Sequence, residues 1–72
     1  MQAPVTYVVK PRLRQLLKEK GLTQLQLQKI SGVPQASISR FDNNTRHEAT
    51  HLFAISHALG VSIEDLFIVK RL

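Results

Sequence analysis

The sequence contains no cysteine and no long hydrophobic run. Without cysteine, neither a disulfide framework nor a thiolate metal site can supplement the core, and a cytoplasmic origin fits. No apolar stretch approaches the roughly 20 residues of a transmembrane helix, and the first ten residues lack the basic start and long apolar centre of a signal peptide. We therefore expect a cytoplasmic protein that has no contact with a membrane.

Acidic residues are also few, because five Asp and Glu oppose ten Lys and Arg, for a net charge of +5. Residues 1–40 carry seven Lys or Arg against Glu19, a net +6, whereas residues 41–72 carry three against four acidic residues, a net −1. A basic half of this kind suits a polyanion, and nucleic acid is the commonest large one in cells. Ordinary solvated lysines are the alternative explanation.

The chain is short, and its 72 residues allow one small domain. A chain of this length buries only about 60% of the surface that its unfolded form exposes, which leaves little room for a cleft. The hydrophobic fraction of 43% and the charged fraction of 21% are near globular averages. We expect one folded domain over residues 1–72.

Apolar residues recur at helical spacing in short runs, which predicts a row of short helices. The first is expected over 11–21, with proline in the first turn and glycine as a left-handed stop. A capping box of Thr23 and Gln26 predicts the start of a second helix, whose Leu27 and Ile30 face the core. The segment Ser31-Gly32-Val33 then predicts a tight turn with valine in the core.

A third helix is expected from Pro34, with Ile38 and Phe41 inward and the polar residues outward. A fourth is expected over 48–59, and a short fifth follows Ser62 as its N-cap. The β-prone segments at the two chain ends predict a two-stranded ribbon. Two short helices around a glycine turn, the second polar and exposed, describe a helix-turn-helix that reads the DNA major groove. The alternative is a helical bundle whose third helix is merely surface.

The run from Gly21 to Phe41, GLTQLQLQKISGVPQASISRF, resembles the helix-turn-helix of the XRE family, which includes phage Cro proteins and lambda-type repressors. The likeness covers roughly 13–67, including ALGVSIEDLF at 58–67. It implies an all-α fold: a compact five-helix, lambda-repressor-like DNA-binding domain with its helix-turn-helix at about 23–43. The short terminal β-ribbon would be an addition to that fold.

The resemblance also implies residue roles, and the residue types suit them. Glutamine can pair bidentately with adenine, arginine with guanine, and alanine can meet a thymine methyl. Hydroxyl and amide groups near phosphates fix register without reading sequence. The implied base contacts are Gln35, Ala36 and Arg40, and the implied phosphate contacts are Gln24, Ser37, Ser39, Asn43, Thr45 and Arg46.

Three positions depart from the pattern of the family. Gln28 stands where the family usually has alanine, a small residue that lets the two helices of the motif approach closely. Pro34 replaces the usual Ser or Thr cap, so the recognition helix lacks that side-chain acceptor. Asn44 replaces the usual glycine at the end of the recognition helix. It is of a type that tolerates the left-handed region.

A second pattern points to a different chemistry, because His47-Glu48-x-x-His51 matches the zinc-binding motif of metalloproteases and His57 lies six residues further on. On a helix, His57 would be rotated about 120° from His51 and lie roughly 9 Å along the axis. Ala54 stands where zincins have the glycine that returns the chain to the metal. The histidines therefore fit a structural or surface role, with sharing of a metal by His47 and His51 left open.

Together these patterns predict a non-enzymatic, sequence-specific transcriptional regulator that inserts its third helix into the major groove of double-stranded DNA. It is expected to bind as a homodimer through the apolar chain ends or Phe53, without a metal or another cofactor. The alternative is a protein-interaction or antitoxin-like module that keeps the fold and holds a partner through the same surfaces. A zinc-binding protein is the remote alternative.

Overall fold

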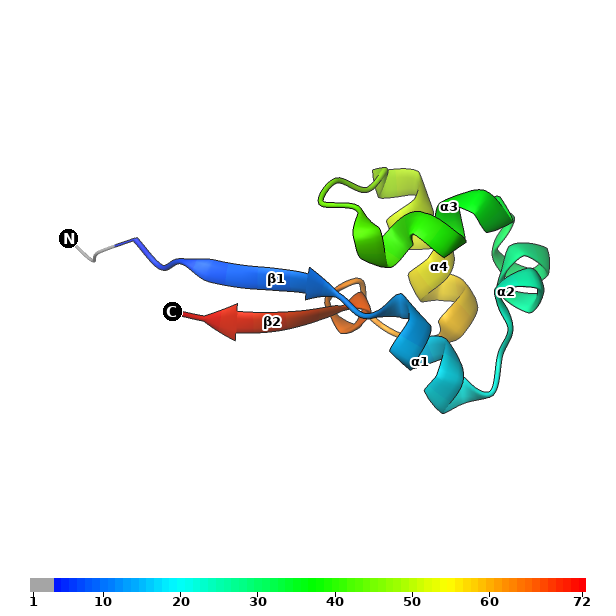
Figure 1. Ribbon diagram of the computed structural model, residues 1–72, viewed down its shortest axis with the longest axis horizontal. Helices are drawn as coiled ribbons and strands as arrows, with labels where there is room; N and C mark the ends of the chain where they lie inside the picture. Colours follow the sequence, from blue (N-terminus) through cyan, green and yellow to red (C-terminus); the bar gives the residue numbers. More distant parts are fainter. Residues whose placement is uncertain (1–3) are drawn as a thin grey trace.

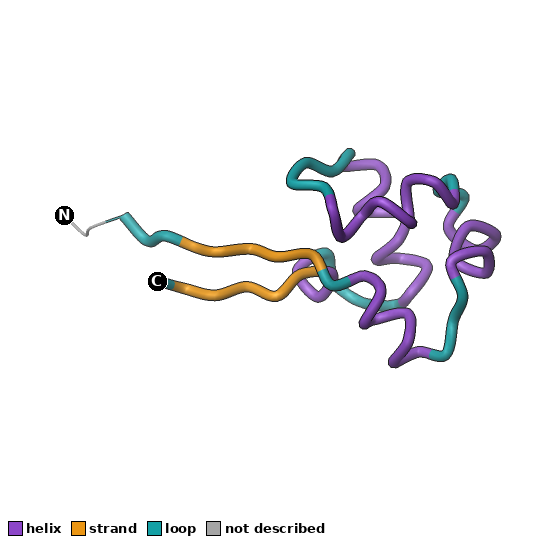
Figure 2. Tube along the Cα trace, viewed as in Figure 1, coloured by secondary structure: helices purple, strands orange, loops and turns teal. Residues whose placement is uncertain are grey.

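A computed structural model describes residues 4–72 of the chain, so the first three residues of the expected domain lie outside it. The described residues form a helical body and a two-stranded sheet that projects from one side (Figure 1). Figure 2 shows the two chain ends running side by side along this sheet, which accounts for the elongated extents of 47 × 23 × 21 Å. The elements in chain order are β1 (Tyr7–Pro11), α1 (Leu13–Lys20), α2 (Gln24–Ser31), α3 (Gln35–Arg40), the 3₁₀ turn η1 (Phe41–Asn43), α4 (Ala49–Leu59), the 3₁₀ turn η2 (Glu64–Leu66) and β2 (Phe67–Arg71).

The expectation of five helices is wrong by one, since residues 4–72 contain four α-helices and two 3₁₀ turns. The expected fifth helix is only η2, because Phe67 directly after it belongs to β2. Ser62 and Asp65 exchange hydrogen bonds at the start of this turn, Ser62 N to Asp65 Oδ2 at 3.0 Å and Asp65 N to Ser62 Oγ at 3.3 Å. The backbone N–H of Ser62 lowers the pKa of Asp65 from its ordinary value. Within residues 4–72, no helix is both long and apolar enough to cross a membrane.

The core is built from the inward faces of the helices, as the spacing predicts, with one exception. Val33 in the turn and Ile38 on α3 are buried, whereas Ile30 is 55% exposed. Ile30 lies three residues after the fully buried Leu27, which rotates it about 60° away from the direction of Leu27 and towards solvent. The buried hydrophobic residues are Leu13, Leu16, Leu17, Leu27, Val33, Ile38, Phe41, Ile55, Leu59 and Leu66.

The first helix begins differently from the expectation, because Pro11 ends β1 and α1 starts at Leu13. The carboxylate of Asp42 accepts hydrogen bonds from the backbone N–H groups of Leu13 (2.7 Å) and Arg14 (3.0 Å). The guanidinium of Arg14 in turn donates to the Ser39 carbonyl at 3.3 Å. The start of α1 is thus fixed to the segment that follows α3.

The terminal ribbon is confirmed, with β1 and β2 antiparallel. Side chains alternate between the two faces of a strand, and directly opposite residues share a face. The pairs Tyr7–Arg71, Val9–Val69 and Pro11–Phe67 therefore lie on one face, and Val8–Lys70 and Lys10–Ile68 lie on the other. We name the first of these the tyrosine face.

Candidate nucleic-acid interface

The helix-turn-helix segment starts with the predicted capping box, which is confirmed. Gln26 N donates to Thr23 Oγ1 at 3.1 Å, and Thr23 N donates to Gln26 Oε1 at 2.8 Å. Helix α2 ends at Gly32, whose φ of 77° is a conformation that glycine adopts without strain. Val33 then enters the core and directs the chain into α3.

The first turn of α3 depends on a side chain from α2. Pro34 is the N-cap residue and makes no side-chain cap. Instead, the Gln28 side-chain oxygen accepts a hydrogen bond from the backbone N–H of Gln35 at 2.7 Å. The long amide at position 28 therefore turns towards α3, and two departures from the family pattern, at positions 28 and 34, compensate one another.

The exposed side of α3 carries all the predicted base contacts. Gln35, Ala36 and Arg40 are exposed, whereas Ile38 between them is buried. Helical geometry places the three exposed residues within about 140° of one another around the axis, so they share one side of the helix. By the same geometry Ser39 lies within this side and Ser37 lies at its edge, and both are half-buried.

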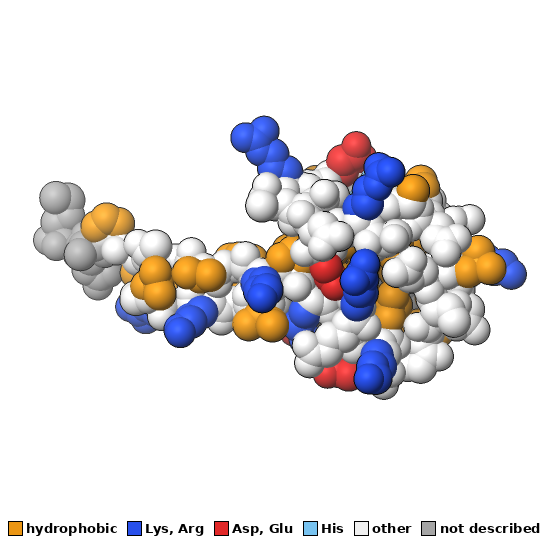
Figure 3. All heavy atoms as spheres, viewed as in Figure 1, with side chains coloured by type: hydrophobic (Ala, Val, Ile, Leu, Met, Phe, Trp, Pro, Cys, Tyr) orange, Lys and Arg blue, Asp and Glu red, His pale blue; other side chains and the backbone are white. Residues whose placement is uncertain are grey.

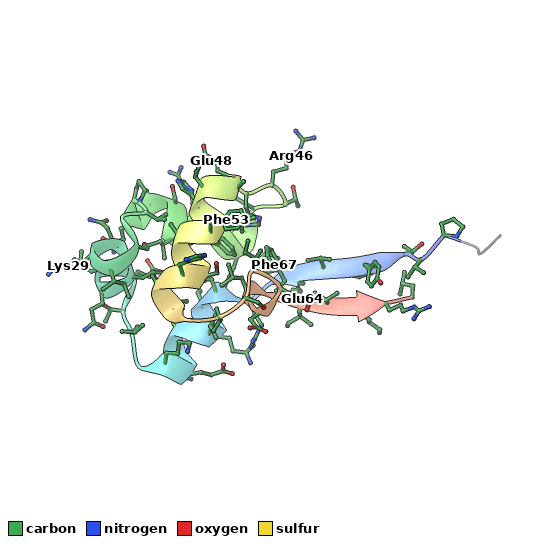
Figure 4. All side chains as sticks on the ribbon, turned by 180° about the vertical axis from the view of Figure 1, so that it is seen from behind. Lys29, Arg46, Glu48, Phe53, Glu64 and Phe67 are labelled. Carbon is green, nitrogen blue, oxygen red and sulfur yellow. The ribbon has the colours of Figure 1, made fainter. Side chains whose placement is uncertain are left out.

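The segment after α3 places further polar groups beside it. Asn43, Thr45 and Arg46 are exposed, and Arg46 points away from the body (Figure 4). Asn44 is extended, with φ −93°, and α3 continues directly into η1, so the expected left-handed end is wrong. Gln24 is half-buried at the start of α2.

A hollow of about 250 Å³ lies between the end of α3 and the start of α4. It brings together Ser37, Arg40 and Arg46, three of the residues for which a nucleic-acid contact is predicted. Figure 3 shows Lys and Arg side chains spread over the visible face of the helical body, with fewer acidic ones. The hollow is lined by Ser37, Arg40, Phe41, Asn44, Arg46, His47, Glu48 and His51.

The comparisons with known proteins agree with this arrangement. The family model described as the Cro/C1-type HTH DNA-binding domain matches residues 12–71. The chain belongs to this family. Cro/C1-type domains bind double-stranded DNA, act in transcription regulation and are typically not enzymes. Searches of curated proteins and of solved structures gave no significant match.

The first histidine of the zinc motif, His47, has a structural role in this Cro/C1-type domain. Helix α4 begins at Ala49, with Glu48 as its N-cap, so His47 precedes the helix and does not lie one helical turn from His51. The Nε2 atom of His47 is 2.7 Å from the Phe41 carbonyl oxygen. The centroid of the His47 ring lies 4.1 Å from the ring centroid of Phe41 and 5.6 Å from that of Phe67.

The other two histidines make separate contacts. The Nε2 atom of His51 lies 3.4 Å from Oε2 of Glu48, and His57 packs beside Phe53 with ring centroids 6.4 Å apart. In the described part of the chain, no three His, Asp or Glu side chains are grouped as metal ligands would be. His47 thus lies outside the helix that carries His51 and His57.

Three contributions to the interface were not predicted from the sequence: the Gln28 bond, the Asp42 bonds and the packing of His47. The sequence does contain a pattern that could have predicted the Gln28 bond. A proline at the N-cap leaves the helix start without a side-chain acceptor, and a long amide seven residues upstream can reach it. The other two depend on contacts between elements that no local rule specifies.

Proposed function

We propose that the chain is a non-enzymatic, sequence-specific regulator that inserts α3 into the DNA major groove and needs no cofactor. The supporting observation is the exposed side of α3, where Gln35, Ala36 and Arg40 lie together above a buried Ile38. Gln35 suits an adenine edge, Arg40 a guanine edge and Ala36 a thymine methyl. In this proposal residues 1–72 form a single DNA-binding domain with its helix-turn-helix at 23–43.

The flanking polar residues then contact the DNA backbone on both sides of the recognition helix. Arg46 projects from the segment after η1, and the hollow beside it offers further donors to a phosphate. Such contacts fix the register of the protein on DNA without reading sequence. The proposed phosphate contacts are Gln24, Ser37, Ser39, Asn43, Thr45 and Arg46.

Salt and two arginine variants test this proposal. DNA affinity should fall steeply between about 50 and 200 mM salt if several phosphates are engaged. Arg40→Ala should cost about 1–3 kcal/mol and relax the preference at one base pair, whereas Arg46→Ala should weaken all sequences alike and lower the salt slope by about 1. Binding to a selected operator and to its single-base variants measures both effects.

The matched control is Lys20→Ala, which removes one positive charge at the end of α1, on the opposite side of the body from α3 in Figure 1. It should change neither the base preference nor the salt slope by as much as the arginine variants. Binding that is insensitive to salt, or absent for every DNA, would exclude the proposal and favour a protein-interaction module.

We propose further that the regulator binds as a homodimer joined through the tyrosine face of the ribbon. Tyr7, Val9 and Val69 are exposed there, and the face continues into Phe67, which packs on the core. An isolated two-stranded ribbon is marginally stable, so a second copy would stabilise it. The tyrosine face carries one positive charge, Arg71 at its outer end, whereas the opposite face carries two, Lys10 and Lys70, and would repel a second basic chain more strongly.

Adjacent valines test which face is used, because Val9 is 53% exposed on the tyrosine face and Val8 is 48% exposed on the other. Val9→Lys should reduce dimerisation and cooperative binding to paired half-sites by at least about tenfold, since a buried charge without a partner is costly. Val8→Lys should leave both unchanged. Sedimentation and titration of a two-half-site DNA measure the difference, and equal effects of the two variants would exclude this interface.

A further inference from the structure

At the start of α3, the backbone N–H of Gln35 bonds to a side chain from α2 and not to a carbonyl of α3 itself. The first N–H groups of a helix have no partner within the helix. The Pro34 carbonyl accepts from Ser37 N at 3.0 Å and Ile38 N at 3.1 Å, which leaves the N–H of Gln35 to the Gln28 side chain. With only six residues, α3 has little further backbone bonding to keep its first turn in place.

Gln28 is bonded to both ends of the turn that joins the two helices. Its backbone carbonyl accepts from Gly32 N at 2.9 Å, which ends α2, and its side-chain oxygen accepts from Gln35 N at 2.7 Å, which begins α3. Gln28 as a residue is half-buried, while its bond to Gln35 N lies at the exposed start of α3. One residue therefore fixes how the second helix of the motif leaves the first.

The two ends of α3 are held by different means. Arg40 at the far end lies next to Phe41 and close to Ile38, and both of these are buried in the core. Gln35 at the near end is exposed, and its backbone N–H has the Gln28 oxygen as its hydrogen-bond partner. Loss of that bond should loosen the first turn of α3 and leave the last turn in place.

We propose that Gln28 is a positioning residue for DNA reading, which holds the first turn of α3 so that Gln35 meets its base. This inference rests on the proposed insertion of α3 into the major groove. It assigns a specificity role to a residue of α2 that itself need not touch DNA.

Gln28→Met tests the inference, because methionine has the same length but no oxygen acceptor. We expect the Gln35 amide to exchange with solvent about tenfold faster and Tm to fall by about 4–8 °C, as expected for the loss of one hydrogen bond. On a selected operator, discrimination at the base pair read by Gln35 should fall about tenfold, and discrimination at the pair read by Arg40 should persist. Gln15→Met, at an exposed position on α1, is the matched control and should change neither the exchange of the Gln35 amide nor the discrimination between bases.

Two further variants separate positioning from general destabilisation. Gln28→Glu keeps an acceptor and should preserve the protection of the Gln35 amide. Adding Pro34→Ser to Gln28→Met supplies a conventional cap and should restore both Tm and discrimination. Unchanged exchange of the Gln35 amide in Gln28→Met, or an equal loss of discrimination at every base pair, would overturn the proposal. If the unmodified protein bound no DNA, the proposed function would fail while the amide exchange still reported on the cap.

Discussion

Phe41→Ala is expected to lower the free energy of unfolding by about 3–5 kcal/mol, a large part of the 5–15 kcal/mol typical of a domain. The Phe41 side chain is 3% exposed, with its ring centroid 4.1 Å from that of His47 and 5.8 Å from that of Phe67. Its removal leaves a cavity between α3, His47 in the segment before α4, and Phe67 at the start of β2. Urea unfolding should show a lower midpoint with an unchanged slope.

The matched control for this change is Phe53→Ala, which removes the same side chain from a position on α4 that is 57% exposed. It should cost much less, because most of that ring is already in contact with water. Phe41→Leu should lie between the two, since leucine fills part of the space. Equal losses for Phe41→Ala and Phe53→Ala would contradict the placement of Phe41 in the core.

The parts of the fold that the sequence predicts correctly depend on contacts within one element. The Thr23–Gln26 capping box needs only residues three apart, and it forms as expected. Ile38 and Phe41 are correctly placed inward because helical spacing decides which side of a short helix meets the core. Apolar chain ends without another covering element predict their own pairing, and the ribbon confirms it.

The errors arise where a contact between distant residues overrides a local rule. Pro11 suits the first turn of a helix locally, but its pairing opposite Phe67 keeps it in a strand. Ser62 suits the N-cap of a fifth helix locally, but the pairing of Phe67 opposite Pro11 takes the chain into β2 directly after the three residues of η2. The base contacts come from the family resemblance and stay predictions, whereas the exposure of Gln35, Ala36 and Arg40 on one side of α3 follows from their spacing along the helix.

The cap on α1 leads to the second large effect, a loss of about 2–3 kcal/mol of stability in Asp42→Ala. This change removes an ionised acceptor from two backbone donors, at 2.7 Å and 3.0 Å, at a helix N-terminus. Hydrogen bonds to charged groups contribute about 1.5–3 kcal/mol each, so two would sum to about 3–6 kcal/mol, and the partial exposure of this site lowers the expected total to about 2–3 kcal/mol. Denaturant unfolding and far-ultraviolet circular dichroism measure the stability and the helix content.

Asp42→Asn should cost about half as much, because the amide keeps one acceptor oxygen and loses the charge that favours a helix N-terminus. Glu64→Ala is the matched control, since it removes an exposed carboxylate and should change stability by less than about 0.5 kcal/mol. Equal losses for Asp42→Ala and Glu64→Ala would contradict the cap.

Because Asp42 follows α3 by two residues and Arg14 also bonds the Ser39 carbonyl, Asp42→Ala should weaken base discrimination at the pair read by Arg40 and leave the pair read by Gln35 less affected. This is the reverse of the effect expected for Gln28→Met, so the two variants together test whether the ends of the recognition helix are held independently.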